Sequence, residues 1–150
     1  MIITNSARQT IALGKKYAAE LKLGAVLGLI GELGAGKTQF VKGLAKGLGI
    51  KNNISSPTFV LLKKYNQLIH IDCYRLSNSE ELLDLGWQEL VTDKNNIIVV
   101  EWADKIRKIM PQDTRWIKFS IGKKDNQRKI NIFTPRVIRL PRTLIIHEKT

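Results

Sequence analysis

Apolar residues along the chain occur either as short continuous runs or at helical spacing. Residues 25–30 and 97–100 are continuous runs of strand length, and the second consists of four consecutive β-prone residues. Such a run predicts a strand that is buried on both faces, as in a parallel sheet. Shorter runs bounded by turn residues predict four more strands, at residues 59–65, 68–72, 116–121 and 128–133. The last two strands should pair antiparallel, because only residues 122–127 separate them.

Stretches with helical spacing alternate with these strands. Ser6 and Gln9 form a capping-box pattern that opens a first helix, and Gly24 provides its stop. A second such pattern at residues 77–80 opens a helix whose apolar positions continue to Leu90. Further helices are predicted at residues 39–48 and 103–110. The alternation predicts an α/β fold with a mostly parallel sheet, flanked by helices and carrying antiparallel strands at its edge.

The segment between the first strand and the helix at residues 39–48 reads GELGAGKT and occupies residues 31–38. It fits the phosphate-loop pattern G-x-x-x-x-G-K-[ST] at every specified position, in the strand-to-helix context that the pattern requires. Glycines allow close backbone approach, and N–H groups at the start of a helix favour bound phosphate. The fold is therefore predicted to be P-loop NTPase-like, with nucleotide contacts from Gly34, Ala35, Gly36, Lys37, Thr38 and Gln39.

Lys37 and Thr38 carry the chemistry of this loop. The lysine ammonium suits the β- and γ-phosphates of a nucleotide, and the threonine hydroxyl is placed to ligate Mg²⁺. The alternative is a glycine-rich turn that binds nothing. It is disfavoured because strand, glycines, lysine, threonine and helix all coincide.

Two carboxylates follow predicted strands. Asp72 ends the strand at residues 68–72, and Glu101 comes directly after residues 97–100. The carboxyl ends of strands form the side on which open α/β sheets bind ligands. Asp72 is therefore a candidate to orient water or to hold Mg²⁺ through water, and Glu101 is a candidate Mg²⁺ ligand, with a capping or salt-bridged Glu as the alternative. His70 should share a face with Asp72 by strand alternation, and a structural or supporting role is favoured for it.

The charge balance is strongly basic. The chain has 150 residues, the usual size of one domain, and 25 Lys and Arg against 13 Asp and Glu give a formal net charge of +12. The excess favours contact with RNA or an acidic protein surface, and a composition that serves solubility is an equal alternative. We expect one domain over residues 1–150. Its basic tail, from about residue 134, would be a docking segment, an RNA contact or a wrapped end.

Cys73 is the one cysteine in the sequence. A lone cysteine cannot form an intrachain disulfide, which fits a reducing cytoplasm, and a packed thiol is expected. No apolar run approaches the roughly 18 residues of a membrane span, and the N-terminus lacks the hydrophobic core of a signal peptide. The protein is therefore expected to be soluble and cytoplasmic, with no membrane partner.

Several short segments, in order and in spacing, resemble the bacterial TsaE (YjeE) family of small ATPases of tRNA threonylcarbamoyladenosine synthesis. Together they cover about residues 6 to 105. The departures are few, with Glu32 where Asp is commoner and Cys73 where a larger apolar residue is usual. The matching segments are residues 31–38, Gly43 with residues 48–49, residues 56–59, residues 70–76, residues 81–82 with 85–86, and residues 100–102.

The resemblance implies an ATPase that acts with the TsaD and TsaB proteins, which attach a threonylcarbamoyl group to adenosine 37 of tRNAs reading codons that begin with A. It implies ATP and Mg²⁺ as cofactors, and tRNA as a partner, reached through the complex or directly. Slow intrinsic ATP hydrolysis that partners stimulate is expected, since Arg75 is only a candidate arginine finger.

The resemblance also assigns roles to single residues, including Thr10, which by spacing alone would be a solvated helix residue. The roles implied by the resemblance are phosphate binding and catalysis for Lys37, Mg²⁺ binding for Thr38 and Glu101, catalysis for Asp72, and proximity to the nucleotide for Thr10, Trp102 and Arg128.

Two other function classes share these features. A small-molecule kinase would have the same loop, but it usually needs an arginine-bearing lid, and residues 77–91 contain no arginine. A nucleotide-gated RNA adaptor would account for the basic charge and would bind RNA in a salt-sensitive way. GTP specificity is disfavoured because no N-K-x-D motif follows Glu101.

Overall fold

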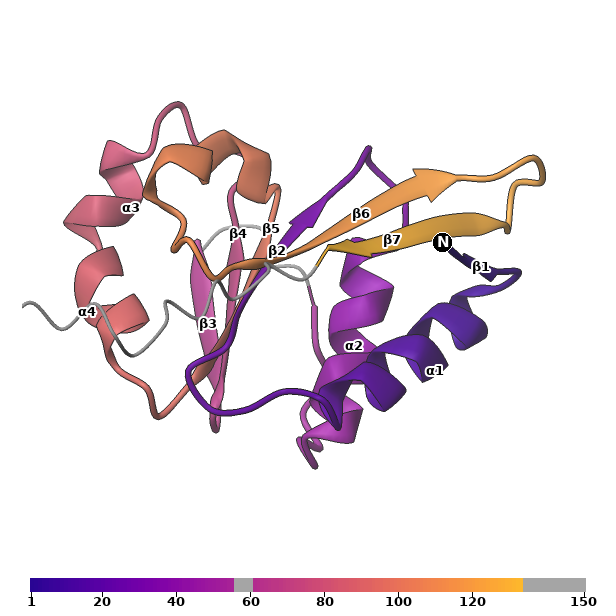
Figure 1. Ribbon diagram of the computed structural model, residues 1–150, viewed down its shortest axis with the longest axis horizontal. Helices are drawn as coiled ribbons and strands as arrows, with labels where there is room; N and C mark the ends of the chain where they lie inside the picture. Colours follow the sequence, from indigo (N-terminus) through magenta and orange to yellow (C-terminus); the bar gives the residue numbers. More distant parts are fainter. Residues whose placement is uncertain (56–60, 134–150) are drawn as a thin grey trace, which may run out of the picture.

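The computed structural model describes residues 1–55 and 61–133 (Figure 1). Seven strands form one sheet: β1 (Ile2–Thr4), β2 (Val26–Ile30), β3 (Leu62–Tyr65), β4 (Leu68–Asp72), β5 (Ile97–Glu101), β6 (Arg115–Ile121) and β7 (Arg128–Phe133). The helices are α1 (Ala7–Ala18), α2 (Lys37–Gly47), α3 (Glu80–Asp84), α4 (Trp87–Thr92) and the 3₁₀ helix η1 (Ala103–Ile109). No helix in the described part of the chain is both long and apolar enough to cross a membrane.

The centre of the sheet is parallel. The strand order is β1-β7-β6-β2-β5-β4-β3, and β6, β2, β5 and β4 pair in parallel. Strands β7 and β1 extend one edge antiparallel, and β3 extends the other. All five residues of β5 are buried, as the apolar run at residues 97–100 predicts. The predicted α/β class, with a parallel centre and antiparallel edges, is confirmed.

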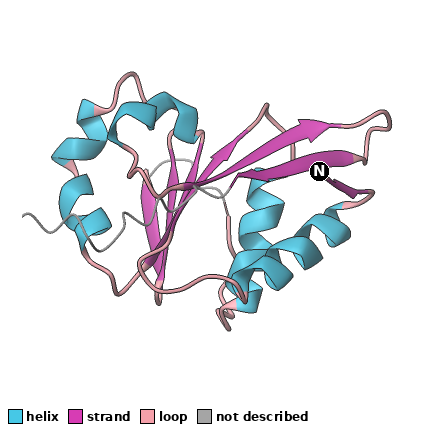
Figure 2. Cartoon of the chain, in the orientation of Figure 1, coloured by secondary structure: helices cyan, strands magenta, loops and turns pink. Residues whose placement is uncertain are grey.

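Helices cover both faces of the sheet (Figures 1 and 2). Helices α1 and α2 lie on one face, where a hydrophobic cluster includes Phe40, Leu27 and Phe119. Helices α3, α4 and η1 lie on the other, with a second cluster around Trp87 that also contains Cys73. Cys73 is fully buried, so the predicted packed thiol is confirmed, and this burial raises the pKa of the thiol to about 12.

Helices α1 and α2 approach each other through two glycines. A Cβ at Gly43 would lie 2.0 Å from the Ile11 carbonyl oxygen, and one at Gly14 would lie 2.3 Å from the Phe40 carbonyl oxygen. Both obstacles are backbone atoms, which cannot rotate away as a side chain can. The contact therefore fixes α2, and with it the loop at its N-terminus, against α1 and the sheet.

Two predicted helices differ in the structure. The first helix opens as predicted, with the Ser6 hydroxyl accepting from Gln9 N–H, but it ends at Ala18 instead of continuing to Gly24. The predicted helix from residues 77–80 to Leu90 is two helices, α3 and α4, because Gly86 adopts φ +88° between them. A left-handed residue interrupts the hydrogen-bond ladder even though the apolar spacing continues through it.

The predicted capping box at residues 77–80 is also wrong. Helix α3 begins after Ser79, which makes no side-chain capping bond. Instead, the Asn78 side-chain oxygen accepts from Glu80 N–H, and Ser77 N–H donates to Glu81. Local side-chain bonds of this kind compete with regular caps.

The remaining element boundaries differ less. Helix α2 begins at Lys37, earlier than the predicted residue 39, and the predicted helix at residues 103–110 is the 3₁₀ helix η1. Strand β3 begins at Leu62, while residues 56–60 of the predicted strand and loop lie outside the described residues. The predicted basic tail from residue 134 lies outside them as well.

Replacing Gly43 by Ala should destabilise the fold by about 1–3 kcal/mol or more, because the added methyl collides with backbone of α1. Urea unfolding followed by circular dichroism measures the change. Lys46→Ala, at an exposed position of the same helix, is the matched control and should alter the free energy of unfolding by less than about 0.5 kcal/mol. Equal stability of the two variants would contradict the proposed contact.

Candidate functional site

A cavity of about 750 Å³ opens where β2, β4 and β5 reach their carboxyl ends. This volume is in the usual range for a small-molecule site. The structure brings every residue predicted for the site to this one cavity. Its walls include Thr10, residues 34–39, Asp72, Glu101, Trp102 and Arg128.

The loop at residues 31–38 forms one wall of the cavity. Gly36 is the N-cap of α2 and has φ +103°, a left-handed conformation that favours glycine. No described side chain caps this helix end. The first N–H groups of a helix lack intrahelical partners, so they remain available to an anion at this wall.

Lys37 is buried within the loop, with 5% of its surface exposed. Its ammonium donates to the carbonyl oxygens of Gly31 and, at 2.9 Å, Glu32, and it lies 4.1 Å from the centre of the Trp102 ring. Burial lowers the pKa of Lys37, although the nearby carboxylates of Glu101 and Asp72 oppose the shift. The cation is thus held inside the cavity wall by carbonyl oxygens and an aromatic face.

Trp102 turns the chain at the end of β5. It has φ +57°, and Asn66 is the other non-glycine residue with positive φ in the described ranges. Its ring pairs with that of Tyr74, with 5.0 Å between the ring centres. The aromatic pair lines the cavity beside Lys37. Tyr74 was not among the predicted site residues, although it lies in the segment 70–76 that carries the family resemblance.

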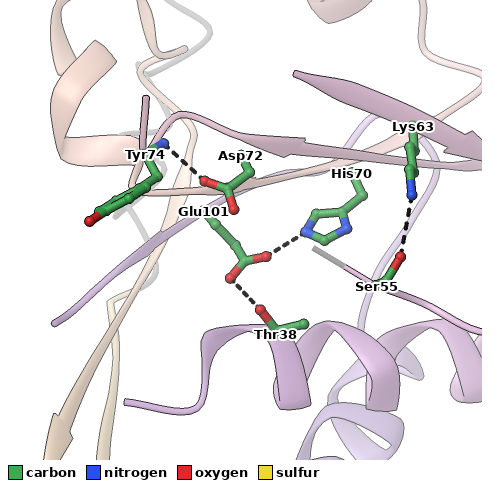
Figure 3. Close-up of polar contacts among 7 residues, drawn as sticks. All are labelled: Thr38, Ser55, Lys63, His70, Asp72, Tyr74 and Glu101. Atoms are coloured by element: carbon green, nitrogen blue, oxygen red, sulfur yellow. Dashed lines mark hydrogen bonds and ion pairs between the residues drawn. The ribbon is translucent and has the colours of Figure 1, made fainter. Parts of the chain in front are cut away.

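The acidic wall is built from β4 and β5, whose register places Asp72 opposite Glu101. The Thr38 hydroxyl donates to Glu101 Oε1 at 2.9 Å, and His70 Nε2 lies 2.6 Å from Glu101 Oε2 (Figure 3). Asp72 Oδ1 accepts from Tyr74 N–H at 2.9 Å (Figure 3). The predicted common face of His70 and Asp72 is confirmed, because both lie on the side of the sheet that meets α2.

The donor set suits Mg²⁺ bound together with phosphates. Among residues 1–55 and 61–133, no group of three or more His, Cys, Asp or Glu could hold a metal by itself. Mg²⁺ usually takes only one or two protein oxygen ligands and completes its shell with phosphates and water. The adjoining hydroxyl of Thr38 and carboxylate of Glu101 provide such a pair next to the loop at residues 31–38.

Helix α1 and the β6–β7 hairpin also contribute to the lining of the cavity, beside Gly34 and Gly36. Thr10 is 1% exposed, and its hydroxyl lies 2.7 Å from that of Thr4, so its description as a solvated residue is wrong. The short strand β1, which the sequence pattern did not predict, covers it. Arg128 Nε donates to the Gly34 carbonyl at 3.2 Å and ties the hairpin to the loop. Asn126 also lines the cavity and was not predicted.

Comparison with known proteins identifies close relatives. The family model described as "Threonylcarbamoyl adenosine biosynthesis protein TsaE" matches residues 4–130. The tRNA threonylcarbamoyladenosine biosynthesis protein TsaE of Treponema pallidum (strain Nichols) is 40% identical over 133 residues, covering 87% of this chain and 97% of that protein. The protein of the same name from Bacillus subtilis (strain 168) is 44% identical over 114 residues, covering 73% and 70%.

A solved structure supports the same relationship. The crystal structure of Bacillus subtilis YdiB superposes with a TM-score of 0.76 at 36% sequence identity, covering 89% of this chain and 83% of that one. The matched range 4–130 contains every residue predicted for the site, from Thr10 to Arg128. The resemblance predicted from the short motifs is confirmed. The chain belongs to the TsaE family, which takes part in the biosynthesis of threonylcarbamoyladenosine in tRNA.

Proposed function

We propose that this protein is a Mg²⁺-dependent ATPase that drives threonylcarbamoylation of adenosine 37 in tRNAs reading codons that begin with A. It would act in the cytoplasm, within an assembly with TsaD and TsaB. The observation that supports ATP hydrolysis best is the bond between Thr38 and Glu101 beside the phosphate loop. This bond brings together a hydroxyl and a carboxylate that could both bind a metal ion. They lie at the cavity wall where Lys37 and the first N–H groups of α2 would bind phosphate.

In the proposed mechanism, the loop amides and Lys37 bind the β- and γ-phosphates and stabilise the negative charge that develops during transfer. Thr38 and Glu101 would hold the metal, and Mg²⁺ when bound neutralises phosphate charge. Asp72 is partly exposed on the acidic wall, on the strand next to that of Glu101, and would position or deprotonate the attacking water. Arg128 and Thr10, which line the cavity beside Gly36, would contact the nucleotide there.

Two arginines at the cavity support the proposal that partners stimulate ATP hydrolysis. Arg75 and Arg128 are the described arginines that line the cavity. Arg128 donates to backbone carbonyls of Gly34 and Gln127, so part of its guanidinium is already engaged by the protein, which supports a role in binding the nucleotide rather than one as an arginine finger. Arg75 is exposed, on a turn after β4. We therefore propose that hydrolysis by the isolated chain is slow and that TsaD and TsaB complete the charge stabilisation or order the site.

Adding purified TsaD and TsaB should raise the steady-state ATPase rate of the full chain at least about tenfold, because stabilising groups supplied by a partner have effects of this size or larger. Phosphate release measured with and without the partners tests this. A fast isolated enzyme that is indifferent to them would contradict the proposal. Phosphoryl transfer to a small metabolite would instead favour a kinase.

Lys37→Ala should lower the ATPase rate by about 100-fold or more, because removing a preorganised group that stabilises phosphate charge has effects of this order. Multiple turnover in a reconstituted tRNA-modification assay should be lost as well. Lys42→Ala removes a lysine from the same helix outside the cavity and is the matched control. Unchanged ATPase activity in the Lys37 variant would count against the phosphate-loop assignment.

Asp72→Asn should lower kcat by about 100-fold while nucleotide affinity changes little, because a residue that handles water contributes mainly in the transition state. The amide is almost the same size and can still accept from Tyr74 N–H. Isothermal titration calorimetry with Mg²⁺ and AMPPNP, a non-hydrolysable ATP analogue, measures the affinity. A loss of affinity with kcat unchanged would show that Asp72 serves binding rather than hydrolysis.

A further inference from the structure

His70 is a fully buried imidazole in the middle of β4. Its side chain has 0% exposure, and its Nε2 lies 2.6 Å from Glu101 Oε2. The other oxygen of the same carboxylate accepts the Thr38 hydroxyl at 2.9 Å. The carboxylate of Glu101 is therefore held from two sides, by the sheet through His70 and by α2 through Thr38 (Figure 3).

We propose that His70 is a positioning residue for magnesium binding: it holds Glu101 so that the second carboxylate oxygen faces Thr38 and the phosphate loop. The inference rests on the proposed ATPase function and adds a role for a residue outside the cavity wall. His70 itself would touch neither metal nor nucleotide. Partners of a metal-binding group that fix its orientation commonly affect metal affinity in this way.

The hydrogen bonding of the imidazole supports a role in orienting the Glu101 carboxylate. An ionised carboxylate only accepts hydrogen bonds, so Nε2 must carry the hydrogen. The other ring nitrogen, Nδ1, is buried and has no hydrogen-bond partner among the described residues. Leu68 and Val99 contribute to the hydrophobic cluster on the same face, where an apolar side chain at position 70 would bring no polar atom of its own into the cluster but would leave Glu101 Oε2 without this partner. A buried imidazole with one unpaired nitrogen is a poor choice for packing alone.

Glu101 needs such a partner because a cation lies nearby. Lys37 is close enough for the charge of Glu101 to act on its pKa. In the structure, however, the Lys37 ammonium donates to the Gly31 and Glu32 carbonyls, and Glu101 is in contact with His70 and Thr38 instead. By occupying Oε2, His70 opposes collapse of the carboxylate onto the lysine. Both groups then remain in place, one for metal and one for phosphate.

Two amide substitutions separate positioning from packing. In His70→Gln, the side-chain N–H₂ can reach the position of Nε2 and donate to Glu101. In His70→Asn, the amide is one methylene shorter and does not reach. The measurement is the affinity for AMPPNP, by calorimetry on the full chain, in Mg²⁺ and in EDTA. Binding of Mn²⁺ to the protein–AMPPNP complex, followed by electron paramagnetic resonance, gives a direct metal readout.

The wild type should bind AMPPNP more tightly in Mg²⁺ than in EDTA. His70→Asn should reduce this gain, and the Mn²⁺ affinity, by about tenfold or more, while affinity in EDTA changes little. His70→Gln should retain most of both. Ile69→Val, on the same strand but in the opposite hydrophobic cluster, is the control and should behave as wild type.

Three results would overturn the inference. His70→Asn could keep the full Mg²⁺ gain, His70→Gln could lose as much as His70→Asn, or affinity could fall equally in Mg²⁺ and EDTA. The last result would indicate a packing role. Failure of the proposed function would give a different result from these three. The wild-type protein would then bind no AMPPNP in either Mg²⁺ or EDTA.

Discussion

Parallel hydrogen bonding aligns β2, β5 and β4 so that their carboxyl ends reach the same edge of the sheet. Leu29 pairs with Glu101, and Glu101 pairs with Asp72, so the loop at residues 31–38 and both carboxylates leave the sheet at one level. Burial of every residue of β5 makes a register shift costly, because a slip of one residue would turn Glu101 toward the opposite cluster. The register of the strands therefore fixes the relative positions of the loop, Asp72 and Glu101 in the cavity.

The second constraint is the close approach of α1 and α2. At Gly14 and Gly43 the helices are so near that a methyl group would meet backbone oxygen. This sets the position of the N-terminus of α2, and hence the distance from Thr38 to Glu101. The hydrophobic effect packs the helix on the sheet, whereas the two glycines determine how closely it packs. The hydrogen bond between Thr38 on α2 and Glu101 on β5 depends on both the hydrophobic packing and the close approach at the glycines.

The cavity is lined from the centre and from the edge of the sheet. On the central side, Lys37, Thr38, Glu101 and Asp72 combine a buried cation with carboxylates, which suits phosphate with a divalent metal. From the edge, Arg128 links the β6–β7 hairpin to the Gly34 carbonyl, so that edge strands reach the loop. The hairpin and α1 thus complete a site that the central strands begin. Membership of the TsaE family connects this site with tRNA threonylcarbamoyladenosine biosynthesis.

The sequence alone determined the glycine-rich loop at residues 31–38, the buried strand at residues 97–100 and the positions of Asp72 and Glu101, because each depends on a local pattern read along the chain. It did not predict β1, the break at Gly86 or the burial of Thr10. Strand β1 has only three residues and exists through pairing with β7, which is distant in sequence. The contact of His70 with Glu101 likewise joins residues 31 positions apart. Such features were decided by the tertiary structure, because pairing and burial are properties of segments that meet only after the chain has folded.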